Sequence, residues 1–111
     1  MSRLDWVITT PVDDEYVRTG VKDGHRRPVV DAIRCADGTS VSVQASRTHY
    51  CSPRNDYGPW LEVEVGFPSV KPPSSWKKFA DDWKSPTETV YVYVPIEYVR
   101  RFIKAHGGEA A

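Results

Sequence analysis

The sequence has little cysteine and no excess of charge of either sign. Only Cys35 and Cys51 occur in 111 residues, so at most one disulfide can form within the chain. Without a secretory signal, we expect two free thiols in a reducing compartment. Fifteen basic residues balance fifteen acidic ones. The molecule therefore has no strong overall field that would attract extended nucleic acid or an anionic membrane.

Long apolar runs are also absent, and this excludes a membrane span. Before Pro11 only Leu4 to Ile8 is appreciably apolar, and Asp5 interrupts it, so no signal peptide is predicted either. We expect a soluble, intracellular protein without a membrane partner. Hydrophobic residues make up 40% of the chain and charged residues 27%, which are values typical of a globular domain. The length predicts one domain, residues 1–111.

Alternating apolar and polar residues predict strands along much of the chain. The predicted strands are 5–10, 16–22, 29–35, 39–45, 60–67 and 88–95. Asp37-Gly38 lies between two of them and predicts a hairpin with a type I′ turn. In the strand 60–67 one face is expected to carry Trp60, Glu62, Glu64 and Gly66, and the other Leu61, Val63, Val65 and Phe67.

Two helices are predicted in the second half of the chain. A short one, 76–83, would be capped by Ser74 or Ser75. A longer C-terminal one would begin at Pro95, place Ile96, Val99, Phe102 and Ile103 against the sheet and end at Gly107-Gly108. The expected fold is therefore α+β, a curved antiparallel sheet of five or six strands with one C-terminal helix and one short helix.

The segment that follows the hairpin is polar, aromatic and basic, and it is the candidate binding site. Two arginines could hold a phosphate group, hydroxyls could donate to it, and aromatic rings could stack on a base. The predicted ligand-binding residues are Ser46, Arg47, Thr48, His49, Tyr50, Arg54, Tyr57, Trp60, Glu62 and Glu64. The same side chains could instead order the loop against its own sheet, and this alternative stays open.

Catalysis and metal binding have weaker support in the sequence. His49-Tyr50-Cys51 offers two types of zinc ligand, and Cys51 could act as a nucleophile with His49 or His25 as its base. Paired C-x-x-C spacing and an oxyanion element are both missing. Glu62 and Glu64 are expected to form salt bridges. We expect no metal and no cofactor and favour a binding protein over an enzyme, with a small Cys/His-dependent hydrolase as an alternative.

Several segments together resemble a known group of proteins. They are Ser-Val-Gln-Ala-Ser at 42–46, His-Tyr-Cys-Ser-Pro-Arg at 49–54, Val-Glu-Val-Gly-Phe-Pro-Ser at 63–69, Thr-Val-Tyr-Val-Tyr-Val-Pro at 89–95 and the closing Ala-His-Gly-Gly. This pattern is similar to that of a widespread group of small phage and prophage proteins. The resemblance implies an accessory protein in the cytoplasm of an infected bacterial host, with counter-defence as its role. It transfers no catalytic residue.

Two modes of counter-defence follow as expectations from that resemblance. The first is sequestration of a phosphate-bearing, nucleotide-derived immune signal, held by Arg47 and Arg54 and stacked on Tyr50, Tyr57 or Trp60. The second is occlusion of a host defence protein, with Trp76, Trp83 and Tyr57 as exposed anchors. A homo-oligomer is also considered, because the apolar strand 90–94 would aggregate if its edge were open.

Overall fold

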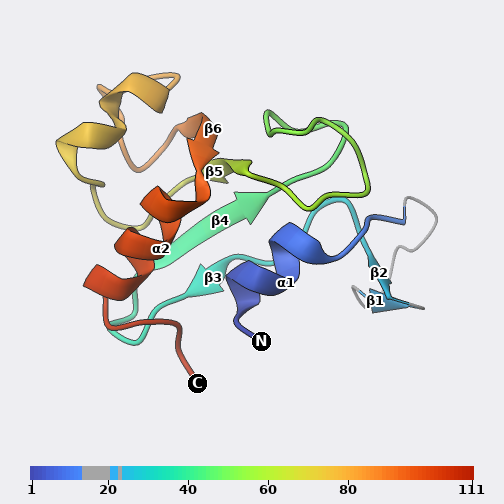
Figure 1. Ribbon diagram of the computed structural model, residues 1–111. Coiled ribbons are helices and arrows are strands. Elements are labelled where there is room, and N and C mark those ends of the chain that lie inside the picture. Colours follow the sequence, from blue (N-terminus) through green and yellow to red (C-terminus); the bar gives the residue numbers. More distant parts are fainter. Residues whose placement is uncertain (14–20, 23) are drawn as a thin grey trace.

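The computed structural model describes residues 1–13, 21–22 and 24–111, and its elements alternate irregularly along the chain (Figure 1). The helices are α1 (Arg3–Thr9), the 3-10 helix η1 (Ser74–Phe79) and α2 (Ile96–Ala105). The strands are β1 (Val21–Lys22), β2 (His25–Arg26), β3 (Ile33–Arg34), β4 (Ser40–Gln44), β5 (Glu62–Gly66) and β6 (Val90–Pro95). The predicted α+β class is confirmed.

The main sheet is antiparallel, with the strand order β3-β4-β5-β6. Within the described residues it has four strands rather than five or six, because β1 and β2 form a separate two-stranded ribbon, whose Arg26 also bridges Val12. Helix α1 packs against β4 and α2 against β6, in front of the sheet in the view of Figure 1. The buried apolar side chains form one core, to which Val41, Val43 and Ala45 belong as predicted.

The predicted hairpin around Asp37-Gly38 is confirmed, but its turn differs. Ile33 pairs with Val41 and Arg34 with Ser40. Cys35 then donates its N–H to the Thr39 carbonyl at 2.7 Å, which leaves residues 36–38 as a three-residue connection. Of these, only Gly38 has a positive φ, at 91°. A type I′ turn needs positive φ at both central residues, whereas a three-residue loop needs it only at the last one.

The predicted strand at 5–10 is wrong, since this segment forms α1. The Ser2 hydroxyl accepts a hydrogen bond from the Asp5 main-chain N–H at 3.0 Å and caps the helix. Leu4, Val7 and Ile8 then fall on one buried face. A short apolar run fits both the helical period of 3.6 residues and the strand period of two, so the N-terminal cap decides in favour of the helix. Of the predicted strand 16–22, only β1 lies within the described residues, and the strand 29–35 shortens to β3.

The predicted alternation along 60–67 holds only in the centre of β5. Val63 and Val65 are fully buried, and Glu62 and Glu64 are half-buried. The prediction is wrong at both ends of the segment. Trp60 is 0% exposed although the alternation places it on the face of the glutamates, whereas Leu61 is 70% and Phe67 60% exposed although the alternation places them with the buried valines. Leu61 donates to the Ser52 carbonyl, and Phe67 turns at a φ of 50°. Both ends therefore leave the sheet, and the period of two no longer applies to them.

The helices after β5 follow the prediction in part. The short helix is a 3-10 turn over Ser74–Phe79 rather than a helix to Trp83, and Trp76 is its buried side chain. The C-terminal helix is confirmed as α2, with Val99, Phe102 and Ile103 buried. No helix in the described part of the chain is long and apolar enough to cross a membrane.

The outer edge of β6 is covered by the chain itself. Ala80 forms an antiparallel bridge with Tyr91, and Asp81 donates its N–H to the Val90 carbonyl at 3.0 Å. Further along, Tyr93 donates to the Tyr50 carbonyl at 3.1 Å. These bonds occupy the edge whose exposure suggested a second subunit. Oligomerisation therefore stays a prediction without that support.

Candidate functional site

The polar side chains at the start of the candidate loop bond mainly to one another. The Ser46 hydroxyl lies 2.6 Å from His49 Nδ1 and 2.8 Å from Thr48 Oγ1. It also accepts the Thr48 main-chain N–H at 3.1 Å. Ser46 and His49 are buried, and burial lowers the pKa of His49, so its imidazole is neutral at physiological pH. The hydrogen bonds among Ser46, Thr48 and His49 therefore order the start of the loop.

Cys51 lies beneath the same loop and is not poised for nucleophilic attack. Its Sγ donates to the Ser46 carbonyl at 3.1 Å and to the Pro53 carbonyl at 3.5 Å. Burial raises its pKa, and burial also raises that of Cys35. Both thiols are buried and free. A reactive cysteine needs a stabilised thiolate, so this geometry does not support the hydrolase alternative.

Metal-type side chains do not cluster anywhere in residues 1–13, 21–22 and 24–111. No group of three or more His, Cys, Asp or Glu there could hold a metal ion. His106 pairs its Nδ1 with Asp37 at 2.7 Å, and this nitrogen also lies 3.2 Å from the Thr39 hydroxyl.

Trp60 is in the core and cannot stack on a ligand from solution. It is 0% exposed, and its indole N–H donates to the Asn55 carbonyl at 3.2 Å. The Arg26 guanidinium lies 5.3 Å above the ring. Trp60 therefore supports the loop from below, since a buried indole needs its N–H satisfied and its faces covered.

Arg26 is an important residue that sequence reasoning missed. It is 0% exposed, and its guanidinium donates to four main-chain carbonyls, those of Val7, Arg27, Pro28 and Ala45. Burial lowers its pKa to about 10, so the side chain is still a cation at neutral pH. The sequence offered no signal, because Arg26 lies in a basic triplet that is typical of a surface.

The two arginines of the loop have different surroundings. Arg47 pairs with the Asp56 carboxylate, which also accepts the Arg47 main-chain N–H at 2.8 Å. Arg54 donates its Nε–H to the Arg47 carbonyl at 3.2 Å, and its guanidinium carbon lies 5.1 Å above the Tyr50 ring. Arg54 is therefore fixed by one bond and one ring while its outer N–H groups face solvent.

Tyr50, Arg54 and Tyr93 form an exposed group that we call the tyrosine–arginine cluster. The tyrosine rings meet edge to face with centroids 6.1 Å apart, and they are 47% and 40% exposed. The main-chain N–H of Tyr50 donates to Glu64 at 3.2 Å. The same loop carries two further exposed apolar side chains, Tyr57 at 75% and Leu61 at 70%. The structure thus joins one end of the loop to β6.

Tyr93 was not among the predicted site residues, because it lies in the most regular strand pattern of the chain. Val63 pairs with Val94 but Val65 with Tyr91, so β6 has one residue more than β5 in this interval. At this bulge Tyr93 has a φ of 52°. The bulge turns the ring out of the sheet and toward Tyr50.

The remaining predicted residues have structural surroundings as well. Glu62 contributes its main chain to the bridge with Ser52, and its side chain is half-buried. Trp76 is 1% exposed, so its prediction as an exposed anchor is wrong. Trp83 is half-buried, with its ring near Lys71 and Tyr91.

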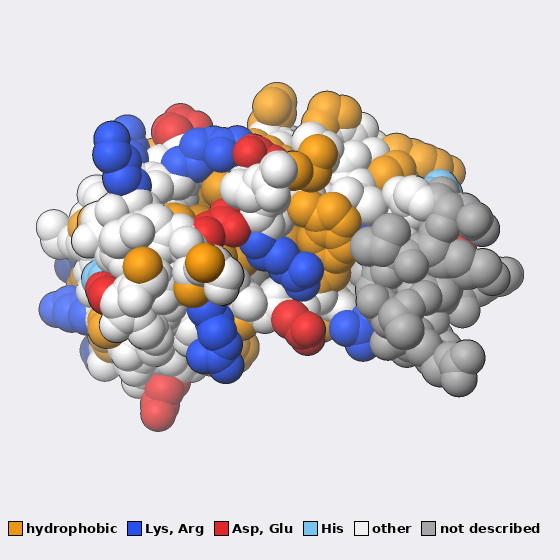
Figure 2. Space-filling view, turned by 90° about the horizontal axis from the view of Figure 1, so that it is seen from below, with side chains coloured by type: hydrophobic (Ala, Val, Ile, Leu, Met, Phe, Trp, Pro, Cys, Tyr) orange, Lys and Arg blue, Asp and Glu red, His pale blue; other side chains and the backbone are white. Residues whose placement is uncertain are grey.

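The lower face of the molecule carries charges of both signs (Figure 2). On this face Lys and Arg side chains alternate with Asp and Glu, without a continuous basic track. The cavities of about 350, 260 and 290 Å³ that described residues bound are lined by residues outside the loop 46–61. In comparisons with known proteins, no family model, no curated protein and no solved structure matches the chain.

Proposed function

We propose that this protein acts by binding a partner protein through the tyrosine–arginine cluster, with Tyr57 and Leu61 at its margin. The observation that carries the proposal is the bulge in β6, which holds Tyr93 at positive φ and brings its ring against Tyr50. An L-residue at positive φ costs about 1–2 kcal/mol, and Gly would avoid this cost. Such outliers and β-bulges concentrate at functional sites, and here the strained residue presents an aromatic ring to solvent.

The composition of the cluster suits a protein interface. Tyr and Arg are enriched among the residues that dominate binding energy, and an aromatic ring on a fixed backbone loses little conformational entropy when it binds. Arg54 is already held by Arg47 and Tyr50, so it is largely preorganised. The resemblance to phage proteins suggests that the partner is a host defence protein.

Nucleotide sequestration is the second candidate, and Arg54 favours it. Its outer N–H groups could hold a phosphate beside the Tyr50 ring. Fewer of the predicted groups are accessible than the sequence suggests, because Ser46 and His49 bond to each other and Trp60 is in the core. The protein-binding proposal needs only the exposed residues, and for this reason we place it first.

One experiment tests both candidates. The wild-type protein and a Tyr50→Ala/Arg54→Ala variant are recovered from infected cells, crosslinked partners are identified, and the heated protein is assayed for released nucleotides. Phe67→Ala is the matched control, since Phe67 is also an exposed aromatic at positive φ but lies at the other end of β5.

A partner protein lost in the double variant and kept in Phe67→Ala supports the first candidate. A released nucleotide with the same dependence supports the second. If the double variant retains every partner and the full counter-defence activity, the cluster is not the binding surface.

A further inference from the structure

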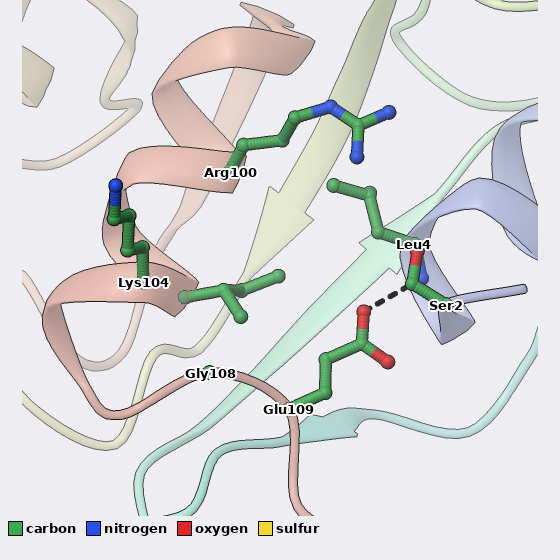
Figure 3. A pocket seen from close by; sticks show the side chains of 7 residues that line it. Ser2, Leu4, Arg100, Lys104, Gly108 and Glu109 are labelled. Atoms are coloured by element: carbon green, nitrogen blue, oxygen red, sulfur yellow. Dashed lines mark hydrogen bonds between the residues drawn. The ribbon is translucent and has the colours of Figure 1, made fainter.

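A cavity of about 350 Å³ lies between α1, α2 and the C-terminal tail, away from the tyrosine–arginine cluster (Figure 3). Leu4 on α1 and Ile103 on α2 line it. Both side chains belong to the core and are almost fully buried, so they form an apolar floor. Its volume lies at the small end of the range for small-molecule sites.

One wall of this cavity is cationic. Arg100 and Lys104 project from successive turns of α2 (Figure 3). Arg100 uses one of its terminal nitrogens to bind Asp5. Among the described residues, no carboxylate lies within ion-pair distance of Lys104. Lys104 is exposed and stands at the rim of the cavity with its ammonium turned outward in Figure 3, and its flexible four-carbon stem lets the charge reach over the apolar floor.

The opposite wall carries a carboxylate that is already satisfied. The oxygens of Glu109 accept the main-chain N–H groups of Arg3 and Leu4 at 2.6 and 3.1 Å. These bonds hold Glu109 on the α1 side, so it does not neutralise Lys104. Its charge, together with that of Asp5, repels anions in proportion to their charge, so a ligand with a single carboxylate on the Arg100 and Lys104 side fits better than one with two or more negative charges.

We propose that this cavity binds a small monocarboxylate with an apolar body, such as a short straight-chain fatty acid. The chain lies over Leu4 and Ile103, where burial of methylene groups is favourable. The carboxylate accepts hydrogen bonds from Lys104 and from the N–H groups of Arg100 that Asp5 leaves free. This site does not depend on the proposed protein-binding function, because the two share no residue.

Hexanoate is a suitable probe, and an amide NMR titration measures its binding. With about eight non-hydrogen atoms, it is expected to bind with a dissociation constant of about 1 mM. The shifts should concentrate at Leu4, Ile103 and Lys104. Acetate lacks the apolar body and hexylamine has the opposite charge, so each should bind at least about tenfold more weakly.

Lys104→Gln should weaken hexanoate binding about five- to tenfold, because it removes the charge and keeps a side chain of similar length. Lys84→Gln, an exposed lysine on the segment between η1 and β6, is the matched control and should change nothing. The proposal is overturned if hexanoate gives no saturable shifts, if the shifts lie outside the cavity, if hexylamine binds equally well, or if Lys104→Gln binds like the wild type.

Discussion

At the scale of single residues, the most unusual feature is Arg26, a buried cation that forms no ion pair with any carboxylate of the described residues. Four carbonyl oxygens and the face of Trp60 surround the Arg26 guanidinium in place of water. Those carbonyls come from three separate parts of the chain, so the guanidinium joins α1, the end of β4 and the segment after β2. It acts as a polar crosslink in a largely apolar core.

Arg26→Met should therefore destabilise the protein by about 2–4 kcal/mol, since the Val7 and Ala45 carbonyls lose a buried donor. Urea unfolding measures the change. Arg34→Met alters an exposed arginine and should shift the free energy of unfolding by less than about 0.5 kcal/mol. Equal effects of the two substitutions would contradict the role assigned to Arg26.

Asp37 gives a prediction about pH. Its pKa is lowered to about 2, first by the main-chain N–H of Thr39, then by the Thr39 hydroxyl and by His106. A carboxyl whose folded pKa is depressed contributes stability above its unfolded pKa and loses it as pH falls through the folded value. The contribution of Asp37 should be complete above about pH 4 and should disappear toward pH 2.

Asp37→Asn keeps a residue that suits the turn but cannot ionise. We expect its urea midpoint to lie below that of the wild type at pH 6, and the two midpoints to converge as the pH approaches 2. Asp31→Asn, at an exposed carboxylate, is the control. A constant difference between Asp37→Asn and the wild type at all pH values would show that the ionised carboxylate is not responsible.

At the scale of elements, β6 combines a regular strand with an irregular feature that its sequence does not reveal. Its alternating valines and tyrosines predict a strand, and the strand forms. The bulge at Tyr93 depends on pairing with β5 and on the Tyr50 carbonyl, neither of which is a local property. A prediction from local pattern therefore finds the strand and misses the exposed ring.

Substitutions at Tyr93 should separate strain from function. Tyr93→Gly removes the strain of positive φ and loses a ring contact of about 0.5–1.5 kcal/mol, so its stability should stay within about 1 kcal/mol of the wild type. Tyr93→Ala keeps the Cβ and should be about 1 kcal/mol less stable than Tyr93→Gly. Thermal unfolding measures both. A Tyr93→Gly variant that is several kcal/mol less stable would mean that the ring has a mainly structural role.

At the scale of the whole molecule, the two ends of the chain are joined. Glu109 bonds to the first turn of α1, Ala110 donates to the Arg34 carbonyl at 2.8 Å, and Cys35 bridges Glu109 beside β3. Figure 1 shows the N- and C-terminal segments near each other below the sheet. The tail thus covers the free edge of β3 and fixes α1.

Glu109→Ala should lower the free energy of unfolding by about 1–2 kcal/mol, since two N–H groups of α1 lose a charged acceptor. Hydrogen exchange at the Arg3 and Leu4 amides should also accelerate. Glu88→Ala removes an exposed carboxylate elsewhere and serves as the control. Unchanged exchange at both amides in Glu109→Ala would show that the tail does not hold the helix.

Local patterns in the sequence were enough to predict the α+β class, the hairpin between β3 and β4, the centre of β5, the existence of β6 and the C-terminal helix. These features follow from local periodicity and turn chemistry, which involve residues close together in the chain. The burial of Trp60 and Arg26, the hydrogen bond between Ser46 and His49, and the contact of Tyr93 with Tyr50 at the surface became visible in the folded molecule alone. These outcomes depend on which distant segments lie together, because a polar side chain is satisfied or exposed by partners that its own neighbourhood in the sequence does not contain.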